Sequence, residues 1–321
     1  MRKLLGAVLF LAFGAAGAFA QDQYPSRSVR IIVPSPPGGV TDILGRVIGQ
    51  AVSQSWGQPV IIDNRPGADE LIGTEYVAKS TPDGYTLLIA SNTAITAAPH
   101  LHSKMPYDPQ KDLTPILMLC QVTPVMNVPA SLPVHSVQEL IALAKAKPGE
   151  LNYGSFGNGS YSNVAMEDFK QKTGTEMTHV PYKGSTPAIA ALLRGEVSVL
   201  IVNLGNVVEY AKAGSIRIIA GAGARRPAMR PDLPTVSESG VPGFSTGAWW
   251  GLFGPANLPH EVTSKIAADV LRTLATPEAR KVFETNTLEQ GDKTADQFAQ
   301  FIAEDLQHWG EMINAANIKP D

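Results

Sequence analysis

Short runs of β-branched and other apolar residues alternate along this chain with segments whose apolar residues recur every three or four positions. The runs have the length and composition of buried strands, and the longer segments have the period of helices that bury one face. Such alternation is typical of parallel or mixed sheets covered by helices, so we expect an α/β fold. The expected strands cover 29–33, 60–62, 85–90, 151–153, 197–202 and 216–220. The expected helices begin near 41, 136, 162, 262 and 294.

Two of these helices carry recognisable start signals. Ser136 with Glu139 has the spacing of a capping box, and Thr294 with Gln297 has the same spacing before the last helix. The length of 321 residues predicts about two domains. No flexible linker separates them, so strands must join the two domains, which suits hinge motion.

The N-terminus has the three parts of a secretory leader. Arg2 and Lys3 are followed by the apolar stretch Leu4–Phe13 and then by Ala18–Ala20, which fits the small-x-small cleavage rule. A retained membrane anchor is the alternative, but the apolar stretch is short for a membrane span. We therefore expect cleavage after Ala20 and export to the periplasm. Loss of the leader takes the formal net charge from −3 to −5.

The charge and the cysteine content exclude several classes of protein. A net negative charge argues against a nucleic-acid partner. The single cysteine, Cys120, excludes an internal disulfide framework and cysteine-based metal sites. A lone thiol in an oxidising compartment is expected to be buried.

Two glycine-rich loops each lie between an expected strand and an expected helix. In Pro34–Asp42 the prolines stiffen the backbone, and Gly38 and Gly39 let it turn close to a ligand. The following helix start offers unpaired N–H groups, to which Thr41 can add a hydroxyl. The second loop, Gly154–Ser162, has three glycines and several hydroxyls. Ordinary strand-to-helix turns remain the alternative, but the pair suggests two jaws that grip one small anion.

The second loop lacks the spacing of known catalytic or phosphate-binding motifs. It is neither a G-x-S-x-G elbow nor a P-loop, and G-x-G-x-x-G is absent. Ser155 and Ser160 are therefore interpreted as hydrogen-bond donors rather than nucleophiles. His100 and His102 lack the partners of a metal site and are interpreted as solvated. We expect no catalysis, no metal and no cofactor.

Two further pairs have a structural and a functional interpretation. The adjacent acids at 69–70 and at 167–168 are expected on solvated faces, because neighbouring helix residues do not face each other. Trp249 and Trp250 could stack on a ligand, although tryptophans in a buried segment more often belong to the core.

Long motifs in a fixed order resemble the Bug/TctC family, the periplasmic substrate-binding proteins of tripartite tricarboxylate transporters. The motifs occupy Tyr24–Arg46, Gly57–Ala68, Pro82–Ser91, Met105–Ile116, Leu151–Ser160, His179–Val197, Leu233–Phe244, Trp249–Pro259 and Ile318–Asp321. The resemblance implies a type II periplasmic-binding-protein fold, with two α/β lobes and a ligand cleft between them. It also implies a monomer that delivers a small organic acid to membrane permease subunits.

The same resemblance implies the lobe boundaries and the ligand contacts. The leader is residues 1–20, lobe 1 is residues 21–122 plus 245–321, and lobe 2 is residues 123–244. Backbone N–H groups and hydroxyls, rather than an arginine clamp, are expected to hold the carboxylate. The expected ligand-binding residues are Pro37, Gly38, Gly39, Val40, Thr41, Asp42, Ser91, Asn92, Thr93, Ser155, Gly159, Ser160 and Asn203.

One departure from the family pattern bears on specificity. Where relatives usually read PGAGGNIG, this chain has Asp69, Glu70 and Leu71 in place of Gly, Gly and Asn. Two carboxylates beside the cleft would oppose a second anionic group of a ligand. The hypothesis is a ligand with one carboxylate and a neutral or basic far end. The alternative, that both side chains point to solvent, stays open.

Other departures point to a less charged and more aromatic pocket. Val202 and Asn163 replace a frequent Asp and a frequent His, and Phe156 and Tyr161 add aromatic surface. An aromatic acid is therefore conceivable as ligand. A sensor-adaptor that presents its ligand to a membrane histidine kinase is the alternative function, and a hydrolase on the same scaffold is a remote third.

Overall fold

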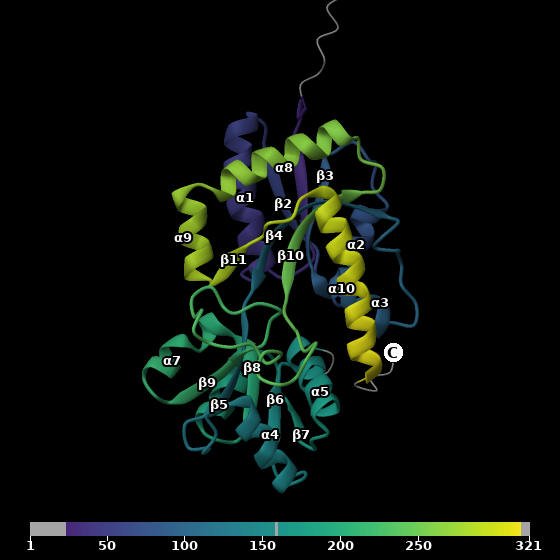
Figure 1. Cartoon of the computed structure of the whole chain (residues 1–321). Helices are drawn as coiled ribbons and strands as arrows, with labels where there is room; N and C mark the ends of the chain where they lie inside the picture. Colours follow the sequence, from purple (N-terminus) through teal and green to yellow (C-terminus); the bar gives the residue numbers. More distant parts are fainter. Residues whose placement is uncertain (1–23, 158–159, 316–321) are drawn as a thin grey trace, which may run out of the picture.

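The computed structural model describes residues 24–157 and 160–315, and it contains two mixed β-sheets. The predicted leader and its cleavage site lie outside the described residues. The six-stranded sheet has the order β11-β4-β10-β3-β1-β2, and the five-stranded sheet has the order β7-β6-β8-β5-β9. We call the first sheet with its helices lobe 1 and the second with its helices lobe 2. Figure 1 shows the lobes as two bodies joined by crossing strands.

The expected strands are all present, and further strands complete both sheets. Lobe 1 contains β1 (Val29–Val33), β2 (Val60–Asn64), β3 (Thr86–Ser91), β4 (Leu113–Val122), β10 (Trp249–Pro255) and β11 (Leu288–Gln290). Lobe 2 contains β5 (Pro124–Pro129), β6 (Asn152–Ser155), β7 (Thr178–Pro181), β8 (Val199–Asn203) and β9 (Ile216–Gly221).

The helices cover both faces of each sheet. In lobe 1, α1 and α8 pack on one face, and α2, η1 and α10 pack on the other. In lobe 2, α4 and α5 pack on one face and α6 on the other. The helices are α1 (Val40–Trp56), α2 (Leu71–Ala78), the π-helix η1 (Thr93–Ala97), α3 (Ala98–Leu101), α4 (Val137–Ala146), α5 (Tyr161–Thr173), α6 (Ser185–Leu193), the 3₁₀ turn η2 (Leu204–Asn206), α7 (Val208–Lys212), α8 (His260–Leu274), α9 (Pro277–Thr285) and α10 (Ala295–Ala315).

Local chemistry explains where several of these elements begin and end. The Ser136 side chain accepts a hydrogen bond from the Glu139 N–H at 3.2 Å, and Glu139 accepts one from the His135 N–H at 2.6 Å. The predicted capping box of α4 is thereby confirmed. At the other end of a helix, α1 stops at Gly57, which adopts φ +63°.

The chain crosses between the lobes at 122–124 and again at 245–248. Strand β4 ends at Val122 in lobe 1 and β5 begins at Pro124 in lobe 2, while β10 resumes lobe 1 at Trp249. The expected boundaries at 122/123 and 244/245 stay a prediction. Helix α10 belongs to lobe 1 but extends to α5 of lobe 2 (Figure 1), where Val164 packs against Trp309 and Ile313.

The only cysteine of the chain lies inside lobe 1. Cys120 is fully buried on β4, and its thiol is not part of a disulfide. Burial raises the pKa of this thiol well above its ordinary value. The expectation of a buried lone thiol is confirmed.

Candidate functional site

The strands that precede the two glycine-rich loops end at the same region, between the lobes. In lobe 1, Ser91 at the end of β3 pairs with Trp250, next to the crossover at 245–248. In lobe 2, Asn203 at the end of β8 pairs with Pro124, beside the other crossover. Because β1 is parallel to β3, and β6 is parallel to β8, the loops after all four strands lie at this interlobe edge. Ligands of open α/β sheets bind at such carboxyl ends.

The first loop is exposed at its tip and fixed at its base. Gly38 has φ +93°, and its N–H donates to the Asp42 carboxylate at 2.9 Å. Arg46 and Asn64 also donate to that carboxylate, at 2.9 and 3.0 Å. The hydrogen bond from Arg46, with its positive charge, lowers the pKa of Asp42. Asp42 is buried and therefore acts as a brace for the loop, while the backbone of Pro37–Gly39 is exposed.

Thr41 connects the start of α1 with β10. Its hydroxyl oxygen accepts a hydrogen bond from the Trp250 indole N–H at 2.9 Å. The hydroxyl keeps its own proton for donation to another group. Trp250 is partly buried against the core of lobe 1, so the core interpretation of this tryptophan is supported. Its polar edge nonetheless positions a predicted ligand donor.

The segment after β3 is held by a side chain that belongs to the turn before α2. The N–H and the hydroxyl of Ser91 both donate to Glu70 Oε2, at 3.1 and 2.9 Å. Asn92 is buried and donates to the Gly247 carbonyl of the crossover at 3.5 Å, whereas Thr93 is exposed. The two predicted donors of Ser91 are thus engaged within the protein.

Asp69 and Glu70 differ in their surroundings, which corrects the interpretation that both acids are solvated. Asp69 is exposed, and its Oδ2 lies 3.4 Å from His102 Nε2. Glu70 is partly buried, and its carboxylate accepts hydrogen bonds from Ser91. Burial raises the pKa of Glu70 to about 7, and the charge of Asp69 adds to that rise. Glu70 is the residue of the pair that faces the predicted ligand segment.

The second loop is built around a buried serine. Ser155 is fully buried, and its hydroxyl lies 2.6 Å from His179 Nε2, a contact that we did not expect from the sequence. The His179 ring stacks on Tyr153 at 4.8 Å, and burial lowers the pKa of His179. Ser160 precedes α5 and donates to the Gly157 carbonyl at 2.7 Å. Gly159 lies outside the described residues.

Asn203 is the last residue of β8, and its side-chain amide oxygen is buried without a hydrogen-bond partner among the described residues. The residue is 9% exposed, and among the described residues no group donates to its Oδ1. Buried acceptors are normally satisfied by protein, water or ligand. Asn203 therefore has the capacity for one further hydrogen bond at the interlobe edge.

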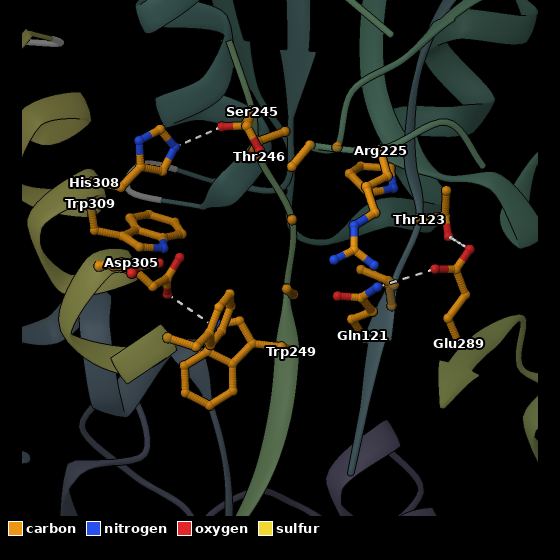
Figure 2. Close-up of a pocket in the computed structure, with 18 of the residues that line it drawn as sticks. Gln121, Thr123, Arg225, Ser245, Thr246, Trp249, Glu289, Asp305, His308 and Trp309 are labelled. Atoms are coloured by element: carbon orange, nitrogen blue, oxygen red, sulfur yellow. Dashed lines mark hydrogen bonds between the residues drawn. The ribbon is translucent and has the colours of Figure 1, made fainter. Parts of the chain in front are cut away.

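A pocket of about 340 Å³ lies against the crossovers, between α10 and β11. Figure 2 shows His308 and Asp305 of α10 on one side, and Gln121 and Glu289 on the other. Many of its polar groups already have partners: Asp305 accepts from Trp249 at 2.8 Å, and His308 Nε2 lies 2.9 Å from the Ser245 carbonyl. None of the predicted ligand residues that the structure describes lines this pocket. Sequence reasoning missed it, because residues that are far apart in the chain form it.

Glu289 joins three segments at this pocket. Its carboxylate accepts from Thr123 at 2.5 Å, from Gln121 at 3.2 Å and from the Ala228 N–H at 3.4 Å. Thr123 lies on a crossover and Ala228 follows β9 of lobe 2, so Glu289 ties lobe 1 to both.

Metal-binding clusters and membrane-spanning helices are both absent from the described residues. In residues 24–157 and 160–315, no cluster of three or more His, Cys, Asp and Glu side chains has the arrangement of a metal site. Over the same part of the chain, no helix combines the length and the apolar character of a membrane span.

Comparison with known proteins identifies close counterparts. The family described as the tripartite tricarboxylate transporter family receptor, TctC, matches residues 44–318. Protein BugT of Bordetella pertussis is 34% identical over 99% of each chain. The structure of R. palustris Rpa4515 with adipate is 35% identical, with a TM-score of 0.75 over 93% of this chain and 100% of that one. MatC from Rhodopseudomonas palustris with bound malate is 29% identical, with a TM-score of 0.71 over 90% and 100%. These neighbours confirm the predicted two-lobed periplasmic-binding-protein fold.

Proposed function

Because this chain belongs to the tripartite tricarboxylate transporter receptor family, we propose that it captures a small organic carboxylate between its lobes and delivers it to a tripartite transporter. Members of this family are periplasmic solute-binding proteins and not enzymes, as expected from the sequence. The relatives Rpa4515 and MatC hold adipate and malate, which are both small carboxylates. Delivery to membrane permease subunits, the monomeric state and leader cleavage after Ala20 are parts of this proposal.

The convergence of four strand ends at the interlobe edge carries the proposal. Strands β1 and β6 are each followed by a glycine loop and then by a helix of 17 or 13 residues. The free N–H groups at such helix starts favour a carboxylate. Asn203 Oδ1 at the same edge is an unsatisfied acceptor, so it can bind a donor group of the ligand or a bridging water rather than the carboxylate itself. The mature chain has a net negative charge, so the N–H groups at the helix starts must supply the attraction.

We assign the ligand contacts to the residues predicted from the sequence, with distinct contributions. We infer that the exposed residues Pro37–Gly39, the backbone of Val40, the hydroxyl of Thr41 and the side chain of Asn203 contact a ligand directly. Ser160, whose hydroxyl already donates to the Gly157 carbonyl, shapes the second loop where it enters α5. Asp42 and Ser155 support the loops from buried positions. Thr93 is exposed at the start of η1, beside Asn92. Gly159 completes the set, although it lies outside the described residues.

Thermal unfolding of the mature chain with a panel of organic acids tests the proposal. A ligand at 100 times its Kd should stabilise the fold by about 2.7 kcal/mol. The variant Thr41→Val keeps the shape and removes the hydroxyl, and it should weaken binding about fivefold, the value of one hydrogen bond. The variant Thr273→Val is the control, because Thr273 is also a buried helical threonine but lies on α8.

The result against the proposal is the absence of any shift with mono-, di- and tricarboxylates. Equal losses of affinity in the two threonine variants would refute the assigned role of Thr41. Deletion of the gene should abolish uptake of the ligand by cells if the protein serves a transporter. Normal uptake in the deletion strain would argue for the sensor role instead.

A further inference from the structure

The Ser91 subsite already holds a carboxylate that comes from the protein itself. Ser91 is buried, and it presents its N–H and its hydroxyl toward one oxygen of Glu70. Two donors on one carboxylate oxygen form a small anion-binding site. The hydroxyl of Ser91 is also held in place, because it accepts a hydrogen bond from the Thr93 N–H at 3.2 Å.

The backbone before α2 holds Glu70 in this position. Ala68, Asp69 and Glu70 have φ values of 45°, 50° and 72°, a left-handed turn that L-residues rarely adopt. The Leu71 N–H donates to the Ala68 carbonyl at 2.9 Å, and the Thr74 hydroxyl donates to the Glu70 carbonyl at 2.9 Å. The carboxylate therefore reaches Ser91 from a backbone that is fixed on both sides.

The helix that follows this turn borders the first glycine-rich loop. Helix α2 packs so closely on the start of that loop that a Cβ added to Gly73 would lie 2.7 Å from the Pro34 Cβ. The strands β3 and β1, which lead to Ser91 and to Pro34, are neighbours in the sheet. Glu70 thus contacts the segment after β3, and the helix that it precedes packs on the start of the first glycine-rich loop.

Resting on the proposed function, we propose that Glu70 acts as an internal carboxylate that occupies the Ser91 donors and selects a ligand with a single carboxylate. A second carboxylate of a ligand could not hydrogen-bond to these donors, because Glu70 already occupies them. The charge of the partly buried Glu70 would also repel that carboxylate. An uncharged or hydrogen-bond-donating far end avoids both penalties. The ligand class is therefore a monocarboxylate with a neutral or basic distal group.

Calorimetry with matched ligand pairs tests this inference. The pairs are the straight-chain dicarboxylates from succinate to suberate and the monoamide of each, which removes one charge with little change of shape. Measurements at pH 8 keep Glu70 charged, since its pKa is about 7. The wild-type chain should bind the preferred monoamide about tenfold more tightly than its diacid. Glu70→Gln should reduce that ratio to about one, mainly by improved binding of the diacid.

Asp69→Asn is the matched control, because it removes the same charge one residue earlier from an exposed side chain. It should leave the ratio of affinities unchanged. Preference of the wild-type chain for the diacid, or an unchanged ratio in Glu70→Gln, would overturn the inference and leave the proposed function intact. The inference would be supported if the Glu70→Gln variant binds diacids and the wild-type chain does not. If neither protein binds any of the compounds, the proposed function is overturned, and the inference with it.

Discussion

A single methyl group at Gly205 should force the two lobes apart. Gly205 lies in η2 of lobe 2, and it contacts Thr287, which precedes β11 of lobe 1. A Cβ at position 205 would lie 1.5 Å from Thr287 Oγ1 and 2.3 Å from Thr287 Cβ. Gly205 does not have a positive φ, so alanine fits its backbone and the effect would come from this contact alone.

The size of the destabilisation follows from the distance by which the added Cβ must move the two segments apart. Rotation of the Thr287 side chain can move Oγ1 away, but its Cβ is fixed by the backbone. Real Cβ contacts essentially never fall under 3.0 Å, so the two segments must separate by about 0.7 Å. Overpacking of this kind costs about 1–3 kcal/mol. The Gly205→Ala variant should lose that amount of unfolding free energy, and ligand affinity should fall because the lobes no longer meet in the same position.

Urea unfolding of four proteins isolates the contact. Gly205→Ala is compared with Thr287→Gly, with the double variant, and with Gly223→Ala, whose added Cβ would have its nearest neighbours at 3.8 Å. Thr287 has φ +53°, a conformation that glycine adopts easily, so Thr287→Gly alone should be nearly neutral. The double variant should recover most of the lost free energy. The reasoning is refuted if Gly205→Ala is as stable as Gly223→Ala, or if Thr287→Gly gives no recovery.

Three further predictions concern stability and accessibility. Because burial raises the pKa of Glu70 from 4.5 to about 7, the folded chain binds this proton more tightly than the unfolded chain; the free energy of unfolding should therefore fall by up to about 3 kcal/mol between these pH values. Urea unfolding of Glu70→Gln should lack that component, and an identical pH profile in both proteins would contradict it. Ser136→Ala should cost about 1 kcal/mol by loss of the cap on α4, and no change in the urea midpoint would contradict this. Cys120 should resist a thiol reagent until the chain unfolds, so fast labelling of the folded protein would refute its burial.

The sequence predicted best those elements whose signal is local. The strand at 29–33 and the turn after it were predicted because β-branched residues, prolines and glycines each restrict the backbone. Strand β10 was missed because Gly251 and Gly254 resemble loop residues. In the structure a Cβ on Gly251 would lie 2.4 Å from the Phe298 ring, so this glycine is required by packing between β10 and α10. Such a contact depends on residues far apart in the chain.

In the candidate site, too, the features with a local sequence signal were predicted and the contacts between distant residues were not. The loops and the helix start after β1 follow from composition and spacing, but the partners of their side chains do not. His179 meets Ser155 because β6 and β7 pair in parallel, with Tyr153 opposite His179. Asp69 and Glu70 stood out as unusual residues, yet only the left-handed turn determines which of them turns inward. The pocket beside α10 could not be predicted from the sequence, because the residues that line it come together only in the complete fold.

The central place of β10 in the lobe 1 sheet has a consequence for how the protein matures after export. β10 pairs antiparallel with β3 on one side and with β4 on the other, although it follows them by more than a hundred residues. A chain that emerges from the membrane N-terminus first presents β3 and β4 with open edges until β10 arrives. Open strand edges are templates for aggregation. Lobe 2, whose strands are contiguous in the chain, can form in that interval, while lobe 1 must wait for its middle strand.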